Sequence, residues 1–218
     1  MQCNCDTTMD ENVRDLTVNT NFLCFGGSFN PIHHGHLICA RVVAETLGFS
    51  KVRLIPSAQP PHKPPSATTG QELASAADRL EMCRIVAAAD GLFDVDGIEL
   101  RRGGPSYTID TVRDLKSAGV AEVHWLIGAD MLRYLPHWHC PLELLAETQF
   151  HVMARPGTEL DFASMPEAFR VLESRVVRAP LLEISATDIR RRVRAGQPVD
   201  YLVPPGVADY IARRGLYR

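Results

Sequence analysis

Residues 26–37 read GGSFNPIHHGHL, and this stretch decides the fold of the 218-residue chain. The apolar run Phe22–Phe25 leads into it and is typical of a buried strand. Apolar side chains at helical spacing follow from Ile38 to Leu47, and Gly48 ends that pattern. A turn that joins a buried strand to a helix predicts the first unit of an open α/β sheet.

The same turn has the chemistry of a phosphate site. Its two leading glycines let the backbone approach a ligand without a Cβ in the way. A helix that begins near Gly35 presents free N–H groups and the positive end of its dipole to an anion. His33 and His36 are three residues apart, so both imidazoles can lie on one side of the helix start.

A plainer interpretation treats the three histidines within four residues as surface polarity or an incidental metal cluster. A structural zinc site needs further Cys or His ligands at matching spacing, and the sequence shows none. The phosphate site is therefore the favoured interpretation.

Composition narrows the class of protein. The length allows one good core. The net charge of -3 gives no reason to expect a nucleic acid or an anionic membrane as partner. No stretch is apolar enough to span a bilayer, and the first residues lack the apolar core of a signal peptide. The six cysteines form no metal or redox pattern, so we expect a reduced, cytoplasmic protein.

The rest of the chain alternates between strand and helix patterns. Lys51–Ile55, closed by Pro56, predicts a second strand that pairs in parallel with the first through a right-handed crossover. We expect further strands and helices at Ala74–Ala89 (helix), Phe93–Leu100 (strand), Ser106–Ala118 (helix), Glu122–Ile127 (strand), Gln149–Ala154 (strand), Pro166–Ser174 (short helix), Val176–Val177 (strand), Ile184–Gly196 (helix) and Val207–Arg214 (helix). This order predicts an α/β, Rossmann-like open parallel sheet with helices on both faces and a small C-terminal helical region.

Ligands of such sheets gather at the carboxyl ends of the strands, where several polar groups are expected. Lys63 stands in the proline-rich loop 57–70; it is either an ordinary exposed lysine or a group that approaches the nucleotide. Ser106 or Thr108 can cap the helix that follows, and the same helix-start amides can bind a ligand.

Two later positions are equally open. Asp130, after the strand 122–127, can accept a hydrogen bond from a ribose hydroxyl or cap the next helix. Trp138 can belong to the core or serve as an aromatic plate for a flat ring. Farther on, Ser185 or Thr187 is expected to cap a helix whose first amides, with Arg190, form a second anion-binding surface.

In this order, the motifs resemble those of bacterial nicotinate-nucleotide adenylyltransferases, a branch of the nucleotidyltransferases with a His-x-Gly-His element. The 26–36 and 184–190 motifs mark the superfamily, and 106–111 with Trp138 points to the nicotinate nucleotide branch. The matching stretches, which span most of residues 21–218, are GGSFNPIHHGH (26–36), PPHKP (60–64), SYTIDT (106–111), GAD (128–130), LPHW (135–138), ARPG (154–157), ISATDIR (184–190) and YLVPPGV (201–207).

The resemblance implies transfer of AMP from ATP to nicotinate mononucleotide, with release of pyrophosphate, in NAD biosynthesis. Mg²⁺ would accompany ATP, held mainly by phosphates and water and not by a protein cage. The implied catalytic residues are His33, His36, Lys63 and Arg190. The implied ATP-binding residues are Gly26, Gly27, Ser28, Phe29, His33, His36, Gly128, Asp130, Arg155, Ile184, Ser185, Thr187 and Arg190. The implied residues for the second substrate are Lys63, Ser106, Tyr107, Thr108 and Trp138.

Two departures and three alternatives accompany this resemblance. Asn30 stands where many bacterial members have Asp, and Ala186 replaces the second Ser of the usual Ile-Ser-Ser-Thr pattern. The alternatives are a sister phosphopantetheine adenylyltransferase or cytidylyltransferase, a nucleotide-binding module without turnover, and a covalent route through a histidine nucleophile. For domains, we expect a mobile extension at 1–20 and one nucleotidyltransferase domain at 21–218, whose C-terminal helical part covers 184–218.

Overall fold

The computed structural model describes residues 21–61, 73–158 and 160–218. The expected extension at 1–20 and Lys63 of the 57–70 loop lie outside the described residues. In chain order the elements are β1 (Phe22–Gly27), α1 (His34–Leu47), β2 (Lys51–Pro56), α2 (Ala76–Ala89), β3 (Phe93–Val95), α3 (Ile98–Arg102), α4 (Thr108–Ser117), β4 (His124–Gly128), α5 (Ala129–Leu132), the 3₁₀ helix η1 (Leu135–His137), α6 (Pro141–Glu147), β5 (Gln149–Ala154), the 3₁₀ helix η2 (Glu167–Arg175), β6 (Val176–Arg178), α7 (Ala186–Arg194) and α8 (Pro205–Arg214).

The strands form one six-stranded sheet in the order β3-β2-β1-β4-β5-β6, and every pairing is parallel. Because β1 lies between β2 and β4, the order of the sheet reverses at the carboxyl end of β1. Open α/β sheets bind their ligands in the crevice at such a point. The predicted Rossmann-like sheet is confirmed, and the turn 26–37 leaves the sheet at this position.

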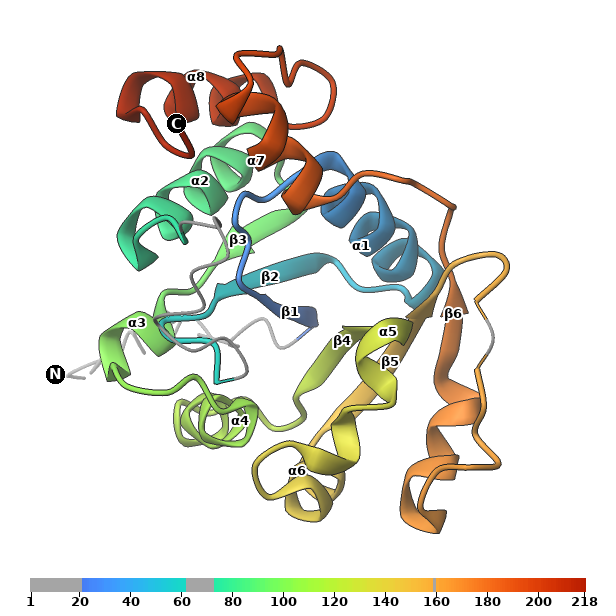
Figure 1. Cartoon of the computed structure of the whole chain (residues 1–218). Helices are drawn as coiled ribbons and strands as arrows, with labels where there is room; N and C mark the ends of the chain where they lie inside the picture. The colour runs from blue at the N-terminus through green and yellow to red at the C-terminus, as the bar shows by residue number, and fades with distance from the viewer. Residues whose placement is uncertain (1–20, 62–72, 159) are drawn as a thin grey trace, which may run out of the picture.

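Two apolar layers hold the helices to the sheet, because successive side chains of a strand point to opposite faces. In β1, Leu23 and Phe25 face one layer and Phe22 and Cys24 face the other. The first layer packs against α1, α2, α7 and α8, and the second against α4, α6 and η2. Figure 1 shows these two groups of helices on opposite sides of the sheet.

The expected strand at Phe93–Leu100 is wrong in its second half. The strand ends at Val95, and Ile98–Arg102 forms the short helix α3. The chain leaves the sheet after the Asp96 N–H donates to the carbonyl of Leu54, and the Asp96 carboxylate then pairs with Arg101 at 2.7 Å. A short apolar run fits either a strand or a buried helix, and the turn at Gly97 decides for the helix.

Within the described parts of the chain, no helix is long and apolar enough to cross a membrane. Cys24, Cys39, Cys83 and Cys140 are free thiols, and the first three are buried. Burial raises the pKa of the Cys24 and Cys83 thiols far above their ordinary value, so these two side chains behave as small apolar groups.

Candidate active site

The turn after β1 is tightly filled by aromatic rings. A Cβ at Gly26 would lie 2.5 Å from the Trp125 ring, and one at Gly27 would lie 3.1 Å from the Phe29 ring. Phe29 itself is buried with a left-handed backbone (φ 42°), and its ring packs edge-on against His36 at 5.4 Å. Both glycines therefore make room for the protein's own rings, which give the turn a rigid base.

His33 and His36 lie together at the start of α1, as predicted. Their rings stack with centroids 3.7 Å apart and planes 21° from parallel. His33 is the N-cap residue, and its carbonyl accepts from the N–H groups of His36 and Leu37. A Cβ at Gly35 would lie 3.0 Å from Nδ1 of His33 and 3.3 Å from the carbonyl oxygen of Ile184, so only glycine fits between these groups without displacement.

Burial keeps both imidazoles neutral at pH 7. The pKa of His33 is lowered to about 4, chiefly by burial and then by charge repulsion from Arg155 and His34. The pKa of His36 is well below its usual range, chiefly because of burial and then through His33 and Arg155. Arg155, which directly follows β5, is thus close enough to act on both rings, in agreement with its predicted place in the site.

Arg190 of α7 joins this group from the far end of the chain. Its Nη1 donates to the carbonyl of Asn30 at 2.7 Å, and its Nη2 donates to Oγ1 of Thr187 at 3.2 Å. Ser185 is the N-cap of α7, where its hydroxyl accepts from the N–H of Asp188. Arg190 and the start of α7, where a second anion-binding surface is expected, thus lie against the turn that holds the histidines.

Three of these side chains each have a buried nitrogen that finds no hydrogen-bond partner among the described residues. They are Nδ1 of His33, Nδ1 of His36 and Nε of Arg190. Buried polar atoms are nearly always paired, so a group of unpaired ones in one place indicates that a ligand completes them. Together with the positive end of the α1 dipole, they suit an anion with several oxygens.

The carboxyl end of β4 contributes Gly128 and Asp130 to the same edge of the sheet. Asp130 is exposed, and its carboxylate folds back over Gly128, where a Cβ would lie 2.4 Å from Oδ1. The N-cap of α5 is Gly128 and no side chain caps that helix, so Asp130 remains free for a ligand hydroxyl.

The 106–108 turn is built differently from the expectation that Ser106 or Thr108 caps the helix. The N-cap of α4 is Tyr107, which makes no side-chain cap bond, so the capping prediction is wrong. The buried Ser106 hydroxyl instead accepts from the N–H groups of Ala58 and Gln59, at 2.8 and 3.2 Å. Its hydroxyl is therefore used to hold the loop after β2, and the free amides of the α4 start remain for a ligand.

Aromatic side chains stand beside that turn. Trp138 is half-buried against the second layer, edge-on to Phe150 at 6.5 Å, and its Nε1 is a buried donor without a partner among the described residues. It is thus both part of the core and a candidate ligand contact. Tyr107 stacks on His139 with centroids 4.3 Å apart, a pair that the sequence motifs did not single out.

Arg79 is the main contributor to the site that sequence reasoning missed. It is fully buried in α2 and donates to the carbonyls of Ser28, Ala58 and Ala74 at 2.8, 3.2 and 3.1 Å. It therefore ties the turn after β1 to the loop after β2. A signal existed, because position 79 falls on the apolar face of α2 that Met82, Cys83 and Val86 form, and an arginine there must find buried acceptors.

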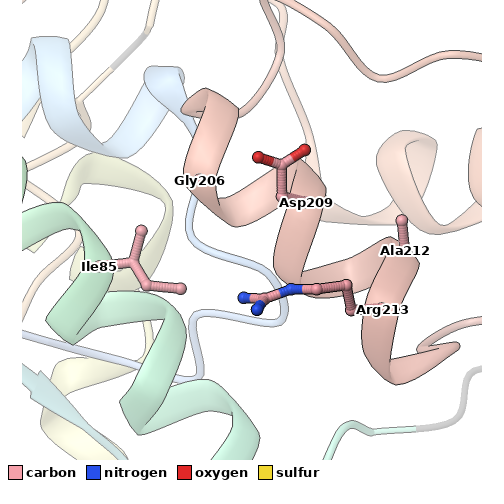
Figure 2. A pocket seen from close by; sticks show the side chains of 5 residues that line it. All are labelled: Ile85, Gly206, Asp209, Ala212 and Arg213. Carbon is pink, nitrogen blue, oxygen red and sulfur yellow. The ribbon is translucent and has the colours of Figure 1, made fainter.

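A hollow of about 500 Å³ lies elsewhere, between α2 and α8 (Figure 2). Figure 2 shows Ile85 on one side and Asp209 and Arg213 on α8 on the other. It shares no residue with the predicted site, and none of the unpaired buried polar atoms lines it. The hollow is therefore separate from the candidate site at the sheet edge.

Comparison with known proteins assigns the family. A model of the cytidylyltransferase-like family matches residues 24–192. A probable nicotinate-nucleotide adenylyltransferase of Thermomicrobium roseum is 42% identical, and the match covers 89% of this chain and 90% of that protein. The chain belongs to the nicotinate-nucleotide adenylyltransferase family. Another member, from Chromobacterium violaceum, is 39% identical over 92% of this chain and 100% of its own length.

Solved structures of the same class share the fold. Nicotinic acid mononucleotide adenylyltransferase of Plasmodium falciparum, complexed with APC, has a TM-score of 0.66 at 15% identity and covers 90% of this chain and 96% of its own. The same protein complexed with NaAD has a TM-score of 0.64 at 16% identity, over 90% and 97% of the two chains. At these identities the likeness supports the fold alone, and the family rests on the sequence relatives.

Proposed function

We propose that this chain transfers AMP from ATP to nicotinate mononucleotide, which gives nicotinate adenine dinucleotide and pyrophosphate. The observation that carries the proposal is the group of buried unpaired nitrogens on His33, His36 and Arg190 beside the turn 26–37. Family membership supplies the substrates, and these nitrogens supply a reason for phosphate oxygens to bind there.

To catalyse this reaction, the protein mainly has to position the two substrates and stabilise negative charge on the phosphates. The phosphate of a mononucleotide is an anionic nucleophile near neutral pH, so its attack on the α-phosphorus needs no general base. Its oxygen forms a bond to that phosphorus while the bond to the β-phosphate oxygen breaks, and pyrophosphate leaves. The barrier comes from the approach of two polyanions and from charge that builds up on the phosphoryl oxygens, which fixed donors stabilise.

His33 and His36 would donate to the triphosphate oxygens near the α-phosphorus, with His36 the more critical. A neutral imidazole carries one N–H, and a bound polyanion raises its pKa and so favours the charged form, which carries two. Arg190 and the amides at the start of α7 would hold the β- and γ-phosphates. Gly128, Asp130 and Arg155 would border the rest of ATP, and Lys63 would reduce repulsion between the two substrates.

The second substrate would lie beside α4 and Trp138. In the 106–108 turn, the N–H groups of Ser106 and Tyr107 already donate to the carbonyls of Gln59 and Pro105. The first N–H groups of α4, from Thr108 on, would therefore meet the carboxylate of nicotinate, because no side chain of the described residues caps this helix. The Trp138 ring offers an apolar face to the pyridine, and its unpaired Nε1 adds a donor at its edge. Tyr107 would flank the same space through its stack on His139.

Mg²⁺ is proposed as the companion of ATP. Among the described residues no group of three or more His, Cys, Asp or Glu could hold a metal ion, and the side chains that gather at the turn are donors to oxygen. Oxygens of the phosphates and of water would therefore supply its ligands, and the ion would neutralise part of the triphosphate charge. The proposal also includes one nucleotidyltransferase domain over 21–218 and a cytoplasmic location.

The test is an assay of pyrophosphate release with ATP and four acceptor conditions. These are nicotinate mononucleotide, nicotinamide mononucleotide, phosphopantetheine and no acceptor. Rapid release with nicotinate mononucleotide alone supports the proposal. Preference for phosphopantetheine would identify a sister enzyme, and ATP binding without release in any condition would identify a binding module; either result contradicts the proposal.

Direct transfer is tested separately from substrate choice. If a histidine were a covalent nucleophile, incubation with α-labelled ATP alone would leave a labelled nucleotidyl group on the protein after denaturation. We expect no label above that of the His36→Ala variant, because the acceptor phosphate attacks ATP directly. A stoichiometric label in the absence of acceptor would overturn this mechanism.

A further inference from the structure

Asn30 connects three distant parts of the chain beneath the proposed triphosphate site. Its side-chain Oδ1 accepts from the hydroxyl of Tyr217 at 2.8 Å and from the N–H of Ala74 at 3.1 Å. Its backbone carbonyl accepts from Nη1 of Arg190 at 2.7 Å. All three of these bonds are buried, and Asn30 is only 6% exposed.

Tyr217 is the unexpected member of this group. It follows the end of α8, is buried at 3% exposure and has a left-handed backbone (φ 64°), so the surrounding structure holds it in a constrained position. Burial raises the pKa of its hydroxyl despite the opposing effect of Arg190 and Arg79. The hydroxyl is thus a proton donor throughout the neutral pH range.

We propose that Tyr217 is a positioning residue for ATP, which acts through Asn30 to fix the carbonyl that holds Arg190. The proposal rests on the triphosphate role of Arg190 proposed above. One edge of the guanidinium is committed to the protein, through the bonds to Asn30 and Thr187, and Nε is left unpaired. A shift of the Asn30 peptide therefore moves the donors that remain for the β- and γ-phosphates.

The geometry also explains why Asn30 can replace the carboxylate that resembling sequences carry. Both bonds to its side chain need only an acceptor oxygen, which the amide supplies without adding a negative charge next to the triphosphate. Arg79 and Arg190 both interact electrostatically with the Tyr217 hydroxyl, so they lie close enough to feel a charge at this point. The amide thus leaves their positive charge undiminished for the substrate.

The test compares Tyr217→Phe with Tyr210→Phe. Tyr210 lies on α8 and also loses a hydrogen bond when changed, because its hydroxyl donates to Asp78 at 2.9 Å. Within the described residues, Tyr210 forms no hydrogen bond with Asn30. We expect Tyr217→Phe to weaken binding of a methylene-bridged ATP analogue about fivefold, the loss typical of one hydrogen bond. Tyr210→Phe should change it by less than about twofold.

Steady-state kinetics give the second measurement. In Tyr217→Phe the KM for ATP should rise about fivefold, while the KM for nicotinate mononucleotide stays within about twofold. Equal changes in both KM values, or equal effects of the two tyrosine variants, would show that Tyr217 only supports the fold and would overturn the proposal. Far-UV circular dichroism and an unfolding curve for each variant confirm that folded proteins are compared.

A double-mutant cycle tests the route through Asn30. Asn30→Ala alone should lower the affinity for the ATP analogue at least as much as Tyr217→Phe does. The double variant should bind the analogue as well as Asn30→Ala does, because both changes break the same route. If the two losses of affinity were additive in the double variant, Tyr217 would not act through Asn30. If Asn30→Ala does not fold, the two tyrosine variants still decide the proposal. Because analogue binding needs no acceptor, its result stands even if the acceptor assay refutes the proposed function.

Discussion

His33 and His36 show how one short motif sets the chemistry of individual residues. Gly35 lets the two rings stack at 3.7 Å, and burial of the pair lowers both pKa values. The resting site is therefore not strongly charged at the histidines and relies on Arg190 and Arg155 for attraction of an anion. The imidazoles can then respond to the charge that develops in the reaction, where a donor contributes most.

At this scale we predict that His36→Ala lowers kcat by at least tenfold, and by about a hundredfold if it removes a full transition-state donor. The measurement is pyrophosphate release at saturating ATP and nicotinate mononucleotide. His34→Ala is the matched control, since the contact of His34 with Leu202 uses its backbone N–H, and its rate should stay within about twofold of wild type. A near-wild-type rate for His36→Ala would refute the assigned role.

Among the elements, α2 contributes more to the site than its distance along the chain suggests. Through Arg79 it holds the carbonyls of Ser28 and Ala58, which belong to the loops after β1 and β2. Through Asp78 it also receives bonds from Tyr210 and Arg214 and so fastens α8. Loops at the sheet edge thus gain their order from a helix that packs against one face.

We predict that Arg79→Met lowers the free energy of unfolding by about 3 kcal/mol, because the carbonyls of three segments, one buried and two half-buried, lose the Arg79 donor at once. Urea unfolding at pH 7 gives the value. Arg84→Met on the same helix is the control, since Arg84 is exposed and pairs only at 3.4 Å with Glu81, and it should change stability by less than about 0.5 kcal/mol. Equal losses in both variants would contradict the clamp.

Neutral histidines lie in two separate parts of the sheet region, one after the carboxyl end of β1 and one within β5. His33 lies at the carboxyl edge, and His151 lies in β5 with its Nε2 3.1 Å from Nδ1 of His124. The pKa of the half-buried His151 is lowered to about 4, chiefly by burial and then by His124 and Arg175, against an opposing effect of Glu122. Both imidazoles therefore resist protonation only as long as the chain is folded.

This sets the sign of a pH effect on stability. Between pH 6.5 and about 4, His33 and His151 bind a proton in the unfolded chain but stay neutral in the folded chain. Protonation therefore favours unfolding, and the free energy of unfolding falls as the pH falls. Each such residue contributes a slope of up to about 1.4 kcal/mol per pH unit. Urea unfolding at pH 7, 6 and 5 should show the decline, and His151→Gln should reduce its slope. An unchanged slope in that variant would exclude His151 as a source.

Much of the architecture could be predicted from local pattern. Alternating strand and helix periodicity, with glycines and prolines at the boundaries, predicted the parallel sheet. Spacing placed His33 and His36 together, and the family resemblance implied that Arg190 joins them. The failures have a common cause. Ile98–Leu100 and the Ser106 hydroxyl have neighbours far along the chain that decide their conformation, and no local period encodes those neighbours.

Most strands and helices, the parallel sheet and the family followed from local pattern, because periodicity, turn chemistry and motifs are properties of neighbouring residues. The contacts that hold the candidate site together came only from the folded arrangement. Arg190 and Tyr217 reach Asn30 across 160 and 187 residues, and Arg79 selects its carbonyls from three segments. A buried donor must find an acceptor wherever folding brings one, so these partners exist only once the layers have packed.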